Sequence, residues 1–268
     1  MAGFFGPGCG GLSRVAGRFV LRTVDGAADL LIEELRGMVA VHSVRQVSVG
    51  AVECMVDGAL DELVRCPLYS SVAVDGAEVP ALAWMRRFGP LERLPWSTNL
   101  VVAEVLTRLA KVRPGQCVVD PFCGTGTILL SVRRRVPTAR LLGIDRDPHA
   151  LELAARNLSH PALVRGLAEA LPVSDGSVDR VVANLPFGKQ VGSHRGNREL
   201  YPAVVRELDR VLAGEGRAVL LTEDKRLLRA AVERERGLKV VRERLLRYNG
   251  ATPTAYVLTR ISKRPTSR

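Results

Sequence analysis

The sequence predicts an α/β protein in which a small ferredoxin-like α+β domain precedes a Rossmann-like domain, whose seven-stranded sheet ends in an antiparallel hairpin. Three observations lead to this prediction. Residues 17–76 follow the order β-α-β-β-α-β, short apolar strands alternate with amphipathic helices from residue 98 onward, and Asn249-Gly250 joins two strand-like runs. Short strands with crossover helices indicate a parallel sheet covered on both faces, and Asn-Gly is a strong hairpin signal.

The small domain is expected over residues 14–76, where the apolar periodicity switches between strand and helix patterns. Its strands are expected at 17–24, 43–49, 51–56 and 69–74, and its helices at 27–38 and 58–66. Residues 77–96 contain three prolines and two tryptophans without clean periodicity. This segment is therefore interpreted as a connector between the domains.

The larger domain is expected over residues 97–262. Its strands are predicted at 116–120, 140–145, 162–166, 178–185 and 217–223, and its helices at 98–110, 127–135, 148–158, 199–212 and 225–235. The runs 238–248 and 251–260 form the predicted hairpin. A parallel sheet that ends in such a hairpin is typical of the class I methyltransferase fold rather than of a plain dinucleotide-binding domain.

The composition favours a soluble, cytoplasmic protein. A chain of 268 residues with 47% hydrophobic content can bury a substantial core. No apolar run approaches the ~18 residues that a membrane span needs, and the glycine-rich N-terminus has no positive charge before Arg14. Five cysteines without a CxxC pair or a histidine at ligand spacing argue against disulfides, structural zinc and any other metal site.

A glycine-containing loop follows the strand 116–120 and leads directly into a helix. Gly124 and Gly126 let the backbone approach a ligand, and the helix presents free N–H groups at its start. Leu129 stands where a dinucleotide fingerprint has its third glycine, so pyrophosphate binding is disfavoured. Asp120 at the strand end suits an ammonium group, such as that of the amino-acid end of S-adenosylmethionine.

Asp145 ends the next strand, where an acid can accept both hydroxyls of a ribose. The alternative is a glycine turn flanked by two helix-capping acids. Asp147 precedes Pro148 and a helix, and it is assigned to capping. The predicted cofactor-binding residues are Asp120, Phe122, Cys123, Gly124, Thr125, Gly126, Asp145, Arg146, Leu167, Ala168 and Asn184.

The strand 178–185 leads into Asn184-Leu185-Pro186-Phe187, which is interpreted as the catalytic site for a target amine. The Asn184 side-chain oxygen and the main-chain carbonyls of a proline-fixed turn can accept the two hydrogens of an NH2 group, and Phe187 can stack on a planar base. Asn184 cannot take up a proton, so catalysis is expected to rest on alignment. The alternative is a simple Asn-x-Pro turn that closes the strand.

Cysteine nucleophiles methylate ring carbons of pyrimidines, but Cys123 lies inside the cofactor loop and is not expected to act in this way. The loop after Phe187 offers further side chains for contacts with the acceptor. The predicted substrate-binding residues are Phe187, Lys189, His194, Arg195 and Arg198.

Four segments carry a family resemblance: DPFCGTGTILL, GIDRDPHAL, NLPFGKQVGSHRGNRELYP and GRAVLLTED. They are similar to the THUMP-containing tRNA guanine-N2 methyltransferases, over about residues 97–260. Residues 14–76 also resemble the small N-terminal domain of that family. The resemblance implies methyl transfer from S-adenosylmethionine to the exocyclic amine of a tRNA guanosine at Asn184-Leu185-Pro186-Phe187. Some relatives work with a small zinc-containing activator subunit.

The sequence departs from the family pattern in three places. The connector is too short to hold the THUMP domain, an RNA-docking module. Ser131 and Val132 stand where family members often carry a glutamate in the helix after the cofactor loop. Leu167 replaces an acid that commonly contacts the adenine amino group, and Glu169 is its nearest substitute. These departures bear on the substrate class.

The net charge of +11 is concentrated at the C-terminal end, because residues 225–268 carry 13 Lys or Arg against 3 Glu. Such a region is typical of a protein that binds a polyanion such as RNA, although an arginine-rich coding bias gives the same composition. Three functions stay open: an RNA guanine-N2 methyltransferase, an N-methyltransferase for a small amine or guanidine, and a catalytically silent remnant that binds RNA or a partner.

Overall fold

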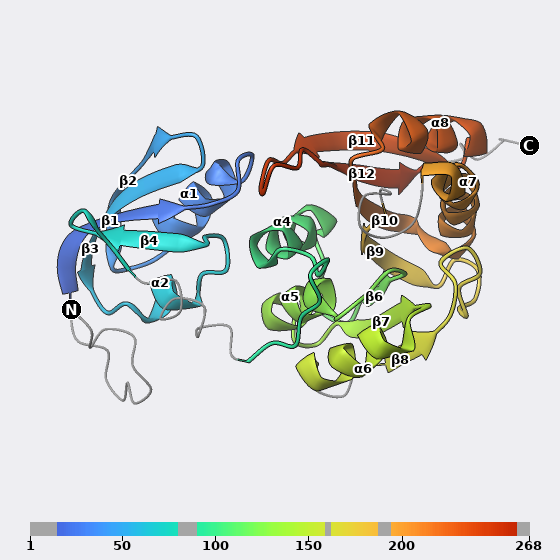
Figure 1. The fold of residues 1–268 in the computed structure, drawn as a ribbon, viewed down its shortest axis with the longest axis horizontal. Helices are drawn as coiled ribbons and strands as arrows, with labels where there is room; N and C mark the ends of the chain where they lie inside the picture. Colours follow the sequence, from blue (N-terminus) through green and yellow to red (C-terminus); the bar gives the residue numbers. More distant parts are fainter. Residues whose placement is uncertain (1–14, 80–89, 159–161, 187–193, 262–268) are drawn as a thin grey trace, which may run out of the picture. The chain divides into compact units, whose positions relative to one another are not determined.

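The computed structural model describes residues 15–79, 90–158, 162–186 and 194–261. The chain divides into two compact units, Met1–Leu91 with Leu246–Gly250, and Glu92–Leu245 with Ala251–Arg268. Each unit is built on its own sheet (Figure 1). No helix in these described ranges is long and apolar enough to cross a membrane.

The first unit contains a five-stranded antiparallel sheet in the order β2-β3-β1-β4-β5. Its elements are β1 (Val15–Arg22), α1 (Ala28–Arg36), β2 (Val41–Ser48), β3 (Ala51–Gly58), α2 (Asp61–Arg65), β4 (Ser71–Val74) and β5 (Ala77–Glu78). The two-residue strand β5 lies inside the segment that the sequence assigned to the connector. Asp75 and Gly76, both with positive φ, turn the chain from β4 into β5, because Asp-Gly favours a tight hairpin.

The second unit contains a seven-stranded sheet in the order β11-β12-β10-β9-β6-β7-β8, with α4, α5 and α6 on one face and α7 and α8 on the other (Figure 1). Its strands are β6 (Cys117–Asp120), β7 (Arg140–Asp145), β8 (Ala162–Arg165), β9 (Val178–Asn184), β10 (Leu212–Thr222), β11 (Leu238–Leu245) and β12 (Thr254–Arg260). Its helices are α4 (Leu100–Ala110), α5 (Thr127–Arg135), α6 (Pro148–Asn157), α7 (His194–Val211) and α8 (Lys225–Glu235).

The pairing of the strands confirms the predicted fold class. Strands β10, β9, β6, β7 and β8 pair in parallel, whereas β12 runs antiparallel to both β10 and β11. Asn249 and Gly250 both adopt positive φ at the tip of the hairpin, as a tight primed turn requires. The parallel strands end at one edge of the sheet, so the loops that follow them lie together.

Helix α7 begins at His194, five residues before the predicted start at residue 199. The sequence pattern missed this first turn because it carries no apolar stripe. A tertiary contact contributes to its position: the Asn197 side chain, only 1% exposed, donates to the Pro186 carbonyl at 2.8 Å. Strand β10 likewise begins at Leu212 rather than at residue 217, with an irregular register between Leu212 and Arg217.

A buried carboxylate joins α4 to α5. The Glu104 side chain is only 3% exposed, and it accepts hydrogen bonds from Arg108 Nε at 2.9 Å, Ser131 Oγ at 2.6 Å and Arg135 at 3.3 Å. Ser131 stands where the family resemblance led us to expect a glutamate, so an acid from α4 occupies the space facing this serine. A buried carboxylate is tolerated because each of its oxygens is paired.

We predict that Glu104→Gln lowers the free energy of unfolding by about 3 kcal/mol, because the buried Arg108 loses its ion pair with Glu104. Glu243→Gln serves as the matched control, since Glu243 pairs with the exposed Arg229 and such pairs contribute about 0.5 kcal/mol. Urea denaturation of both variants measures the difference. Equal, small losses would show that the Glu104 network adds no more than a surface ion pair.

Candidate active site

A cavity of about 900 Å³ opens at the edge of the second unit where the parallel strands end. Four segments form its walls: the loop after β6, the end of β7, the loop after β8 and the end of β9, with α7 beside them. Its lining residues are Trp96, Thr98, Pro121, Phe122, Asp145, Arg146, Asp147, Ala150, Gly166, Leu167, Ala168, Glu169, Asn184, Leu185, Pro186, Gly196, Asn197, Glu199, Leu200 and Ala203.

The loop between β6 and α5 is shaped by its glycines. Gly126 has a φ of 79° at the start of α5, and a Cβ atom there would lie 2.8 Å from Leu158 Cδ1. Any other residue would therefore be strained and would collide with Leu158. Gly124 also has positive φ, and its N–H points to the next strand end, where it donates to Asp145 at 2.8 Å.

Asp145 is held in place by two main-chain groups. One carboxylate oxygen accepts from the Gly124 N–H at 2.8 Å and the other accepts from the Asp147 N–H at 3.0 Å. The side chain is partly exposed and lines the cavity. Each carboxylate oxygen can accept more than one hydrogen bond, so Asp145 remains able to bind ligand hydroxyls in a fixed orientation. Asp147 caps α6 by accepting from the His149 N–H, which confirms its assignment to capping.

Asp120 is a fully buried acid beneath the loop. One of its oxygens accepts from the Phe122 N–H at 3.1 Å, whereas the other oxygen has no partner within the described ranges of the chain. Burial raises the pKa of Asp120 well above its usual range, and the nearby charge of Asp145 acts in the same direction. A ligand cation close to this carboxyl group would favour its ionised form and supply the missing partner.

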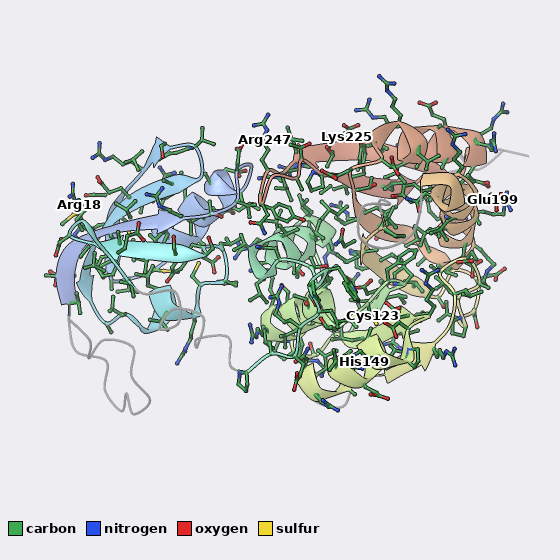
Figure 2. The ribbon with its side chains drawn as sticks, viewed as in Figure 1. Arg18, Cys123, His149, Glu199, Lys225 and Arg247 are labelled. Atoms are coloured by element: carbon green, nitrogen blue, oxygen red, sulfur yellow. The ribbon has the colours of Figure 1, made fainter. Side chains whose placement is uncertain are left out.

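Cys123 lies in the interior of the unit, with 5% of its surface exposed (Figure 2). Burial raises the pKa of this thiol, and the charges of Asp120 and Asp145 raise it further. The thiol is therefore neutral at physiological pH. Because a thiolate is needed for nucleophilic attack, the environment of Cys123 disfavours that role.

The turn after β9 carries an asparagine, Asn184, that lines the cavity. Asn184 Nδ2 donates to Thr98 Oγ1 at 3.2 Å, while Asn184 Oδ1 has no hydrogen-bond partner among the residues that the structure describes. The following Leu185 N–H donates to the Leu221 carbonyl of β10 at 2.9 Å. Asn184 therefore lines the cavity and carries a buried oxygen that can still accept a hydrogen bond.

The Pro186 carbonyl is already saturated. It accepts from Asn197 Nδ2 at 2.8 Å and from the Tyr201 hydroxyl at 2.9 Å, both from α7. A carbonyl oxygen has two lone pairs, so these two bonds use its accepting capacity. We expected the main-chain carbonyls of this turn to accept hydrogen bonds from a target amine. For Pro186 this expectation is corrected, because its carbonyl already accepts from two side chains. The carbonyl of Leu185 remains as the adjoining main-chain group.

The predicted site residues fall into several groups. Eight of them line the cavity: Phe122, Asp145, Arg146, Leu167, Ala168, Asn184, Leu185 and Pro186. Five lie in or beneath the glycine loop without lining it: Asp120, Cys123, Gly124, Thr125 and Gly126. Arg198 is exposed on α7 and does not line the cavity. Phe187, Lys189 and the side chains of His194 and Arg195 lie outside the described residues.

Several lining residues were not predicted from the sequence. Trp96 and Thr98 come from the segment before α4. Asn197 lies in the first turn of α7, which the sequence did not predict, and Glu199 and Leu200 lie where that helix was predicted to begin. Trp96 lies in the predicted connector and Thr98 at the start of the helix predicted at 98–110, and neither position carried a signal for a site. The described lining residues include four carboxylates and one cation: Asp145, Asp147, Glu169 and Glu199, and Arg146. Such a lining favours ligands with positive charge.

Known proteins share this architecture. Residues 97–253 match the family model described as the RMKL-like methyltransferase domain. The chain is 34% identical over 204 residues to a tRNA (guanine(6)-N2)-methyltransferase of Thermus thermophilus, covering 74% of this chain and 60% of that protein. It is 35% identical over 156 residues to the Bos taurus tRNA (guanine(6)-N(2))-methyltransferase THUMP3, covering 52% of this chain and 31% of that protein.

Among solved structures, TrmN from Thermus thermophilus matches with a TM-score of 0.75 and 23% identity, over 91% of this chain and 99% of that one. A possible methylase from Clostridium difficile matches with a TM-score of 0.69 and 13% identity, over 94% of this chain and 100% of that one. These matches show a shared fold.

The chain spans between about a third and three fifths of the length of the curated relatives named above. By its family match over more than half its length, the chain belongs to the RMKL-like methyltransferase domain family, as its resemblance to the tRNA guanine-N2 methyltransferases led us to expect.

Proposed function

We propose that the chain is an S-adenosylmethionine-dependent N-methyltransferase that acts on the exocyclic amine (N2) of a guanosine in tRNA or another RNA. The observation that carries this proposal is that Asn184 lines a cavity bounded by the glycine loop and by Asp145, and that its buried Oδ1 has no hydrogen-bond partner among the described residues. The names of the relatives as tRNA and U6 snRNA guanine-N2 methyltransferases support the choice of acceptor.

The residues around the cavity suit the donor. When bound, S-adenosylmethionine supplies a methyl group activated by a positively charged sulfur. Asp145 is oriented to accept the ribose hydroxyls. Asp120 is fully buried beneath the loop, and its role toward the ammonium group stays a prediction from the sequence. Leu167, half exposed at the wall, offers apolar contact to a planar base, and the exposed Glu169 can accept from its amino group. The acidic lining favours a donor that carries positive charge.

Asn184 orients the acceptor. An exocyclic amine on a base donates two hydrogens, and Asn184 Oδ1 and the Leu185 carbonyl are the acceptors that the turn offers. Accepting both hydrogens turns the nitrogen lone pair toward the donor methyl group. Since an amide takes up no proton, the gain comes from holding the reacting atoms close and aligned.

An RNA acceptor is supported by cations that lie level with the site. Arg244 pairs with Ala255, Ala255 with Leu221, and Leu221 with Asn184, so these four residues form one row across the sheet. Strands lie ~4.8 Å apart, which puts the Arg244 backbone about 14 Å from that of Asn184. Arg226, at the start of α8, is exposed at the same edge.

Two other described cations of the basic region lie elsewhere. Arg236 and Lys239 stand between the end of α8 and the start of β11, at the opposite edge of the sheet, and both are exposed. We expected the whole region 225–268 to contact the RNA acceptor. We now propose this contact only for the cations at the edge of the sheet where the cavity opens. An N-methyltransferase for a small amine remains the second candidate, and the activator subunit stays a prediction from the resemblance.

S-Adenosylhomocysteine at 100 times its dissociation constant is expected to stabilise the folded chain by about 2.7 kcal/mol, because it binds the folded state alone. Asp145→Ala should remove most of the resulting rise in melting temperature. Asp175→Ala, which alters an exposed acid away from the cavity, should retain it. An unchanged dissociation constant for Asp145→Ala in titration calorimetry would remove the ribose role from Asp145.

Asn184→Ala should lower kcat for methyl transfer about a hundredfold, while the dissociation constant of the donor stays near that of the parent, because the lost oxygen aligns the acceptor. Transfer of labelled methyl to total tRNA, compared with a small-metabolite extract, measures the effect and identifies the acceptor class. Parent-level transfer by the variant would mean that the acceptor is oriented elsewhere.

Affinity for tRNA should fall as salt rises, with a logarithmic slope of roughly 0.9 for each phosphate contact. The double variant Arg226→Gln, Arg244→Gln should reduce this slope by about one to two. The matched double variant Arg236→Gln, Lys239→Gln removes the same charge at the opposite edge and should leave the slope unchanged. A flat salt response without detectable tRNA binding would favour the small-molecule acceptor.

A further inference from the structure

Thr98 contacts Asn184 although 86 residues separate them in the chain. Its hydroxyl oxygen lies 3.2 Å from Asn184 Nδ2, and both residues line the cavity. The Thr98 carbonyl accepts from Arg93 at 3.1 Å, and the next residue, Asn99, caps α4 by accepting from two main-chain N–H groups. The main chain at Thr98 is therefore fixed by contacts that do not involve its side chain.

The main chain of the turn Asn184-Leu185-Pro186 is fixed as well. Leu185 is bonded to β10, and the Pro186 carbonyl is held by Asn197 and Tyr201. None of these bonds involves the Asn184 side chain. Within the part of the chain that the structure describes, Thr98 supplies the hydrogen bond of that amide, and Asn184 Oδ1 has no partner.

The two ends of an amide group have nearly the same shape but opposite hydrogen-bonding character. A target amine whose lone pair reacts can only donate to Asn184, so the amide oxygen must face the cavity. The amide nitrogen must then point the other way and find an acceptor. A hydroxyl group can accept, and Thr98 Oγ1 stands where that acceptor is needed.

We propose that Thr98 is a positioning residue that holds the Asn184 amide with its oxygen toward the acceptor amine. This inference rests on the proposed function, because it assigns Thr98 to the same reaction. Thr98 acts through Asn184 and not on the reacting atoms. Its hydroxyl oxygen accepts from the Asn184 amide nitrogen, which would otherwise lack a partner in the productive orientation. Removing the hydroxyl therefore removes about the stabilisation of one hydrogen bond.

Thr98→Val keeps the shape of the side chain and removes the hydroxyl. We expect kcat to fall about tenfold, with the KM for the donor within about twofold of the parent. Thr98→Ser should restore most of kcat. Thr107→Val is the matched control, because it makes the same substitution at a buried position in α4, where the Thr107 hydroxyl donates to the Ala103 carbonyl of the same helix. This control should retain the parent kcat.

A second comparison tests whether Thr98 acts through Asn184. In the Asn184→Ala background, Thr98→Val should cause no further loss, since the group that it positions is gone. Equal losses in the two backgrounds would overturn the proposal, as would an unchanged kcat for Thr98→Val in the parent.

A readout that does not depend on activity is the side-chain amide signal of Asn184 in a ¹⁵N spectrum of the full chain, identified by its loss in Asn184→Ala. Thr98→Val should shift this signal upfield, Thr98→Ser should preserve it and Thr107→Val should leave it unchanged. An unshifted signal in Thr98→Val overturns the proposal. If the parent methylates no RNA, the proposed function fails, whereas this spectrum still decides whether Thr98 holds Asn184.

Discussion

The register of the parallel strands is the constraint on which the site depends. Val119 of β6 pairs with Val181 of β9, and Asp120 pairs with Gly143 of β7. Because these strands end close to one level, the loop after β6, Asp145 and Asn184 meet around one cavity. A slip of one residue would turn every side chain of a strand to the opposite face of the sheet. The buried valines of β6 and β9 oppose such a slip, since they would lose their place in the core.

Much of the fold could be predicted because it is encoded locally. Helix α5 spans the predicted residues 127–135. Asn249 and Gly250 form the predicted turn, and both adopt positive φ. Asp147 caps α6, as its place before Pro148 suggested. The same reasoning located Asp145 and Asn184 at strand ends. In each case a few neighbouring residues determine the backbone, so the pattern is visible without knowledge of distant contacts.

The remaining features depend on contacts between distant segments. The bond between Thr98 and Asn184, and the use of the Pro186 carbonyl by Asn197 and Tyr201, arise only once α4, β9 and α7 are assembled. The early start of α7 belongs to the same group. The distribution of the C-terminal cations between two edges follows from the directions of α8 and β11, which composition does not reveal.

Strand β11 is the outermost strand of its sheet, and this position has a consequence for solubility. Val241 and Leu245 are 48% and 39% exposed there, beside the open hydrogen-bonding edge of the strand. Such an edge can pair with the edge of another molecule, and charged side chains along it discourage that pairing. Lys239 and Arg242 on β11 are charged side chains of this kind, so we expect them to oppose self-association of the chain. Part of the basic character of the chain would then keep its molecules apart.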